Sequence, residues 1–111
     1  MDSLVKYRRA VRQLIEEVAS YEPSEGEVIA ETVFDEERGH YELLCVGWEE
    51  GHYVHDTLIH IDIRGEKVWI QCNETNLLIG EELVKAGVPR QQIVLGFQPP
   101  YKRPDTGFAV A

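Results

Sequence analysis

The sequence predicts an α+β domain in which two helices frame one antiparallel sheet. Near the N-terminus, apolar residues recur every three or four positions, as they do along one face of a helix. Four runs with strand-like patterns of apolar residues follow, with short turns between them. The length of 111 residues fits a single domain over residues 1–111 that buries about two-thirds of its unfolded surface.

The first expected element is a helix whose last turn holds Tyr21 or Glu22, because Pro23 cannot continue it. Asp2 or Ser3 can cap its N-terminus. Its apolar stripe consists of Leu4, Tyr7, Val11, Leu14, Val18 and Tyr21, widened by Ile15. Three heptads are few for a freestanding coiled coil, so we expect this stripe to pack on the sheet of the same chain. A helix pair across a dimer axis is the alternative.

Four strands are expected next, over Glu27–Phe34, Tyr41–Trp48, Tyr53–Arg64 and Lys67–Cys72. The short turns between them favour an antiparallel meander. The second strand is nearly continuous in apolar residues, which is typical of a central strand buried on both faces.

A second helix follows, with Thr75 or Asn76 as its cap and Gly87 just past its end. Pro89 lies two positions further on and cannot continue the helix. The residues Ile93–Leu95 then form a short strand or an extended segment that leads into the C-terminal tail.

The tail from Gly96 to Ala111 contains aromatic residues and prolines, unlike an ordinary disordered terminus. This composition predicts a segment docked on a surface, either of its own domain or of a partner. Its candidate interaction residues are Phe97, Pro99, Pro100, Tyr101, Arg103 and Phe108.

The charge of the chain opposes independent binding to DNA or RNA. Its 20 acidic and 11 basic residues give a net charge of −9, whereas binding to phosphates needs a positive field. An acidic surface instead suits a basic partner. Direct DNA binding would require one local patch made of Lys6, Arg8, Arg9, Arg12, Lys102 and Arg103.

The location that we expect is the cytoplasm. The sequence shows no secretory signal and no apolar run of about 18 residues that would span a membrane. Cys45 and Cys72 lie in apolar settings without CxxC spacing, so we expect two reduced thiols.

No phosphate-binding, zinc-protease or serine-hydrolase motif is present. The best metal candidate is His60-x-Asp62, which places an imidazole and a carboxylate on one side of a strand. Because a catalytic metal usually needs three protein ligands, we interpret the pair as polar residues on a solvated or interface face. His40 and His52 adjoin turns and should be exposed. We therefore expect no enzyme activity, no cofactor and no metal.

Two tryptophans are the remaining candidates for a role at a surface. Trp48 and Trp69 each have the size to fill core volume, which is the interpretation that we favour. The alternative is that they are anchors at a protein interface, and Trp48 is the candidate for that role.

Several motifs along the chain match one family. They are Val46-Gly47-Trp48, Ile59–Ile63, Lys67–Gln71, Glu81–Pro89, Ile93–Phe97, Pro99–Arg103 and Thr106–Ala111. On these residues the chain resembles, over essentially its whole length, the XisI family, the fdxN element excision controlling factor proteins of cyanobacteria. One departure is Gln98, which stands where His is expected.

The resemblance implies a curved antiparallel meander and an accessory factor without established enzyme activity. The recombination itself would be carried out by a separate site-specific recombinase, and an XisH-like protein with a nuclease-type fold is the implied partner. We therefore expect a regulatory interaction module. A direct DNA-binding excision factor is the alternative, followed by a small enzyme of unknown type. A homodimer is compatible with each.

Overall fold

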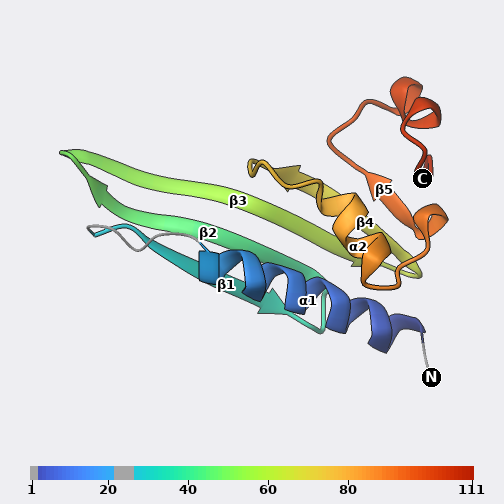
Figure 1. The fold of residues 1–111 in the computed structure, drawn as a ribbon, viewed down its shortest axis with the longest axis horizontal. Coiled ribbons are helices and arrows are strands. Elements are labelled where there is room, and N and C mark those ends of the chain that lie inside the picture. Colours follow the sequence, from blue (N-terminus) through green and yellow to red (C-terminus); the bar gives the residue numbers. More distant parts are fainter. Residues whose placement is uncertain (1–2, 22–26) are drawn as a thin grey trace.

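The computed structural model describes residues 3–21 and 27–111 (Figure 1). Its elements are helix α1 (Ser3–Tyr21), strands β1 (Ile29–Asp35), β2 (His40–Glu49), β3 (His52–Arg64) and β4 (Lys67–Asn73), helix α2 (Ile79–Lys85), the 3₁₀ turn η1 (Arg90–Gln92), strand β5 (Ile93–Leu95) and the 3₁₀ turn η2 (Pro100–Asp105). Asp2, Glu22 and Pro23, which bear on the predicted ends of the first helix, lie outside the described residues.

The sheet has five strands in the order β1-β2-β3-β4-β5. The first four pair antiparallel, as predicted, but β5 pairs parallel with β4. The prediction of a four-stranded antiparallel sheet is therefore incomplete, since the sheet is five-stranded and mixed. The physical reason is the connection: α2 carries the chain back along the sheet, so β5 enters it in the same direction as β4.

Helix α1 packs its apolar stripe on this sheet, which confirms the prediction for that stripe. Tyr7, Val11, Ile15 and Val18 are buried in one cluster with sheet residues such as Leu43. Ile79 and Leu83 of α2 join the same cluster, so both helices cover the same face.

The ends of that stripe depart from the prediction. Tyr21 is 68% exposed, and its hydroxyl donates a hydrogen bond to Glu17 on the helix surface. Ala10, which the periodicity left out, is buried instead. The core contact of α1 therefore ends before Tyr21, its last residue.

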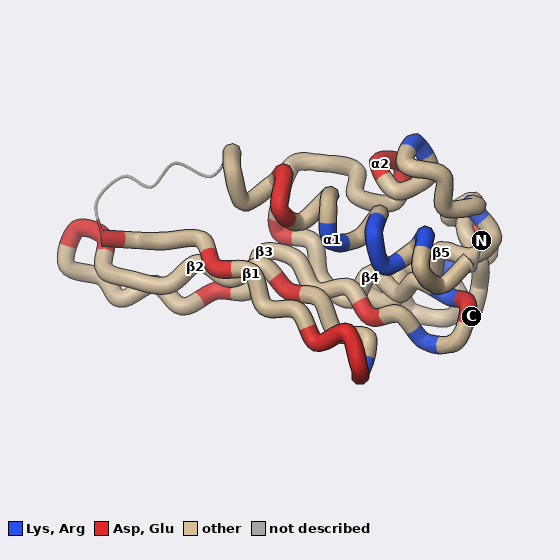
Figure 2. The backbone as a smooth tube through the Cα atoms, turned by 90° about the horizontal axis from the view of Figure 1, so that it is seen from below, with Lys and Arg blue, Asp and Glu red and all other residues tan. Residues whose placement is uncertain are grey.

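Strand β2 is buried on one face only, contrary to the prediction. Tyr41 and Leu43 are fully buried under the helices, whereas Trp48 is exposed. The reason is that both described helices lie on one side of the sheet, so a central strand has cover on that side alone (Figures 1 and 2). An apolar run along a strand does not by itself show that both faces are covered.

The second helix starts later than predicted. Its first residue is Ile79, and no side chain caps its N-terminus. Thr75 instead forms a turn, in which its hydroxyl accepts a hydrogen bond from the N–H of Leu77 at 3.2 Å. The predicted end is confirmed: Gly87 has φ +103°, and its N–H donates to the carbonyl of Val84.

The C-terminal tail docks on its own domain. Ala109 lies beside Val94, and its N–H donates to the carbonyl oxygen of Ile93 at 2.8 Å. Arg103 holds the intervening loop, because its Nε donates to the carbonyl of Gln98 and its Nη1 to that of Val110. The sequence predicted a tail docked either on its own domain or on a partner, and the structure shows it on its own domain.

Phe108 anchors the docked tail. Its ring lies against Gly80, where an added Cβ would be 2.8 Å from the ring, and the guanidinium of Arg90 lies 4.9 Å from its centroid. We expect Phe108→Ala to lower the free energy of unfolding by about 2 kcal/mol, because it removes a half-buried ring and a cation–π contact. Urea unfolding measures this loss. Tyr101→Ala is the matched control: Tyr101 is 76% exposed, so an equal loss would contradict the anchoring role.

Candidate functional site

The face of the sheet that points away from the helices carries exposed apolar side chains on β1, β2 and β3. We call it the open face. Its exposed apolar members are Ile29, Val33, Trp48 and Tyr53. Strand register places three of them together, since Ile29 pairs with Val46 and Trp48 pairs with Tyr53, whereas Val33 pairs with Glu42 further along the sheet. Exposed apolar area of this kind is typical of a surface that contacts another molecule.

An aromatic ladder lies at the far end of the open face. Trp48 and Tyr53 face each other across the β2–β3 hairpin with ring centroids 5.2 Å apart, and the ring of His55 stacks on Tyr53 at 6.4 Å. Trp48 is 54% exposed and Tyr53 is 58% exposed. The favoured interpretation of Trp48 as a core residue is therefore wrong. The hairpin extends beyond the end of α1, so no described helix reaches its tip (Figure 1).

Gly47 explains how the hairpin is held beside the start of β1. It has φ +147°, and a Cβ placed there would lie 1.9 Å from the carbonyl oxygen of Glu27. Only glycine leaves room for this close approach of two backbones. The Val46-Gly47-Trp48 motif thus combines a packing requirement at Gly47 with an exposed aromatic residue at Trp48.

A polar cluster lies on the same side of the sheet, closer to the β1–β2 turn. Asp62 stands at its centre and is only 3% exposed. Its Oδ1 is 2.7 Å from Nδ1 of His40 and 2.8 Å from Nε2 of His60. Its Oδ2 accepts hydrogen bonds from Arg64 at 3.2 Å and Gln71 at 3.3 Å.

These contacts set the ionisation of Asp62. Burial by itself raises the pKa of Asp62, but hydrogen bonds with His40, His60 and Gln71 outweigh it and hold the pKa below its ordinary value. The structure confirms that His60 and Asp62 share one side of the strand, but Asp62 is buried beneath its partners. The expectation of a solvated position is therefore wrong for Asp62.

The sequence pattern does not connect His40 with this cluster. His40 is predicted to be exposed beside a turn, and its imidazole is indeed about half exposed. Counting back from the hairpin turn would pair His40 with Ile61. A bulge between Leu43 and Leu44 shifts the register by one residue and brings His40 opposite Asp62. The hairpin turn is visible in the sequence, but the bulge is not.

Arg103 is engaged within the chain. Its guanidinium lies 5.3 Å from the ring centroid of Trp69, and that of Arg64 lies 5.4 Å from the same ring. The two cations and the hydrogen bonds of Arg103 to the tail tie the C-terminal segment to the sheet. Arg103 is therefore a docking residue of its own chain.

The other tail candidates divide by exposure. Phe97 and Tyr101 are exposed, Pro100 begins η2 at the surface, and Pro99 and Phe108 are half-buried. The tail lies at the opposite end of the long axis from the tip of the β2–β3 hairpin (Figure 1). The structure therefore does not bring the tail residues together with Trp48.

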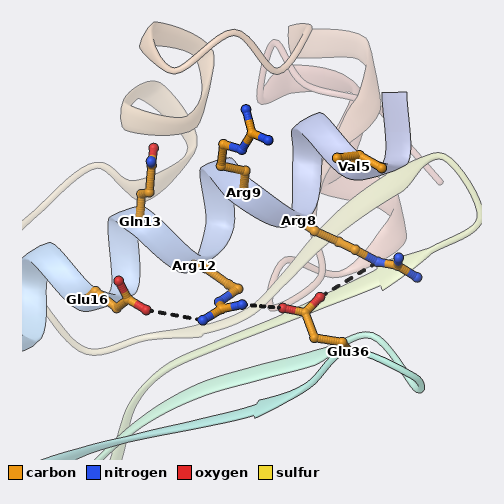
Figure 3. Close-up of a pocket in the computed structure, with 7 residues that line it drawn as sticks. All are labelled: Val5, Arg8, Arg9, Arg12, Gln13, Glu16 and Glu36. Carbon is orange, nitrogen blue, oxygen red and sulfur yellow. Dashed lines mark hydrogen bonds and ion pairs between the residues drawn. The ribbon is translucent and has the colours of Figure 1, made fainter. Parts of the chain in front are cut away.

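The basic residues of α1 border a hollow that also contains acids (Figure 3). Arg12 makes ion pairs with Glu36 at 3.1 Å and with Glu16 at 3.6 Å, and Arg8 lies 3.8 Å from Glu36. Glu36 also accepts a hydrogen bond from the hydroxyl of Tyr41. Burial and this hydrogen bond raise the pKa of Tyr41.

The six basic residues that direct DNA binding would require do not all lie in one patch. Arg8 and Arg12 are paired with acids on the helix side, whereas Arg103 stacks on Trp69, which points to the other side of the sheet. Figure 2 shows basic segments spread over the half of the molecule that holds the termini, with acidic segments along the strands and at the hairpin tip. The charges that could contact phosphates are thus divided between two faces.

Among the residues that the structure describes, none of the helices is both long and apolar enough to cross a membrane.

Comparison with known proteins agrees with this fold. The family model described as XisI protein matches residues 1–110. The crystal structure of a XisI-like protein from Anabaena variabilis is 44% identical, with a TM-score of 0.92 over 97% of this chain and 99% of that one. The crystal structure of the fdxN element excision controlling factor XisI from the same organism is also similar. Its sequence identity to this chain is 35% and its TM-score is 0.87, over 99% of this chain and 100% of that one. No curated protein matches. The chain therefore belongs to the XisI family.

Proposed function

We propose that this protein is a non-enzymatic regulator that controls excision of a DNA element by binding another protein in the cytoplasm. The family supports a role in excision control, because one similar structure is that of an excision controlling factor. The partner that we propose is an XisH-like protein, and the recombinase that cuts the DNA would be affected only indirectly.

The observation that carries the proposal is the open face with its aromatic ladder. Trp and Tyr are the residues that contribute most binding energy at protein interfaces, particularly where apolar neighbours exclude water around them. Trp48 and Tyr53 fit this description, since each is more than half exposed and the open face continues from them to Ile29. Burial of this surface by a partner would remove apolar area from water.

The charge distribution supports a basic partner. The hairpin that carries the ladder has acidic segments at its tip, and the whole chain has a net charge of −9 (Figure 2). A partner that binds DNA needs a positive surface, and such a surface is complementary to an acidic one. The electrostatic contribution would speed association, and the aromatic ladder would slow dissociation.

Co-expression with an XisH-like protein, followed by size-exclusion chromatography, tests this function. We expect one species that contains both chains at micromolar concentration. Two separately eluting species would contradict the proposal. Self-association through the open face would give a larger species without the partner, and a gel-shift series with DNA across salt concentrations would detect direct nucleic-acid binding.

A further inference from the structure

We propose that His40, His60 and Asp62 form a binding site for one divalent transition-metal ion of the zinc class. The donor atoms are Nδ1 of His40, Nε2 of His60 and Oδ1 of Asp62, and all three lie within 4.8 Å of one another. This inference is independent of the proposed partner, because it concerns only the polar cluster.

The distances fit a site that closes around an ion with small movements. Asp62 Oδ1 is 2.7 Å from the His40 nitrogen and 2.8 Å from the His60 nitrogen, both at hydrogen-bond length. Tetrahedral ligands bonded to Zn²⁺ at about 2.0–2.2 Å stand about 3.3–3.6 Å apart. The separation between Asp62 Oδ1 and each imidazole nitrogen therefore needs to lengthen by less than about 1 Å for the ion to replace the shared protons.

The backbone holds the three donors in place before any ion binds. His40 and Asp62 are direct cross-strand partners on β2 and β3, and His60 precedes Asp62 by two residues on the same strand. Two donors from one strand and one from its neighbour converge because alternate residues share a face. Little backbone ordering would thus remain to be done on binding.

The surrounding side chains orient the donors as the outer partners of metal ligands do. Arg64 and Gln71 donate to Oδ2 of Asp62, which leaves Oδ1 directed at the imidazoles. Glu42 lies 3.7 Å from Nδ1 of His60, the nitrogen that would not bind the ion. A carboxylate near that nitrogen favours the tautomer with Nε2 free to coordinate.

The donor set selects the class of ion. Two imidazoles and one carboxylate suit Zn²⁺ and its neighbours in the first transition row, whereas Ca²⁺ and Mg²⁺ prefer oxygen ligands. The His40 side chain is 49% exposed and that of His60 31%, so the ion would be reached from solvent. One or more coordination positions would remain for water.

Titration of the full-length, chelator-treated protein with ZnCl₂ by calorimetry tests the site. We expect one ion per chain. Gln71→Ala, which keeps all three donors, should weaken binding by about 10- to 100-fold, and His60→Gln, which removes a donor, should weaken it by more than that. His52→Gln is the matched control, since His52 is exposed at the hairpin turn and should leave the affinity unchanged. Circular dichroism shows whether each variant folds.

A second measurement uses the unmodified protein and so does not depend on the folding of variants. On addition of Zn²⁺, the ¹⁵N resonances of His40 Nδ1 and His60 Nε2 should shift, while those of His52 stay in place. Absence of stoichiometric uptake would overturn the inference and leave a hydrogen-bonded network without a metal. The inference would also be overturned if Zn²⁺ shifted the resonances of His52, or if His60→Gln bound Zn²⁺ as tightly as the unmodified protein.

Discussion

We expect Gly47→Ala to be among the most destabilising single substitutions in this chain. An alanine Cβ at this position would lie 1.9 Å from the carbonyl oxygen of Glu27, and the residue would keep a positive φ of 147°. The strained backbone costs about 1–3 kcal/mol and the enforced shift of Glu27 about 1–3 kcal/mol, which gives about 2–6 kcal/mol in total. A domain of this size has about 5–15 kcal/mol of stability to lose.

Chemical denaturation of Gly47→Ala measures this loss, and Gly51→Ala is the matched control. Gly51 has φ +81°, but apart from its two chain neighbours no described residue has an atom within 4 Å of a Cβ placed there. Only the backbone term applies, so we expect a loss of about 1–2 kcal/mol. Equal losses for both variants would show that the contact between Gly47 and Glu27 does not constrain the hairpin.

The second large effect that we expect is on binding. Trp48→Ala should weaken the complex with the XisH-like partner by about 2–4 kcal/mol, or about 30- to 700-fold in Kd. The reason is that Trp48 is the largest exposed side chain of the open face and packs on Tyr53. Because it is exposed, its removal should change the free energy of unfolding far less than it changes affinity.

Calorimetric titration of the purified partner with each variant measures this effect. Tyr21→Ala is the matched control, because Tyr21 is also an exposed aromatic residue but lies at the end of α1, outside the open face. We expect its affinity to equal that of the unmodified chain. A similar loss for both variants would mean that the effect of Trp48→Ala is not specific to the open face.

Much of the fold follows from patterns in the sequence. The stripe from Tyr7 to Val18 and the alternation of Ile59, Ile61 and Ile63 have the periods of a helix and a strand, and both pack as these periods require. Gly87 ends α2 because its positive φ is accessible to glycine. These features depend on residues close together in the chain.

The features that could not be predicted depend on distant parts of the chain. The three residues of β5 have little pattern of their own, and only the return of the chain through α2 places them beside β4. Trp48 is exposed because it lies on the face of the sheet that both described helices leave uncovered. The position of His40 beside Asp62 depends on a single bulge, which shifts every later pair in the hairpin.

The most direct test of the central claim, that the open face is the surface by which this protein binds its partner, is hydroxyl-radical footprinting of the complex. Oxidation of Trp48 and Tyr53 should fall when the partner is bound, because both side chains are exposed in the free chain. Oxidation of Tyr21 at the end of α1 and of Tyr101 in η2, outside this surface, should stay the same. Unchanged oxidation of Trp48 and Tyr53 with protection of Tyr101 would instead place the interface on the tail and contradict the account.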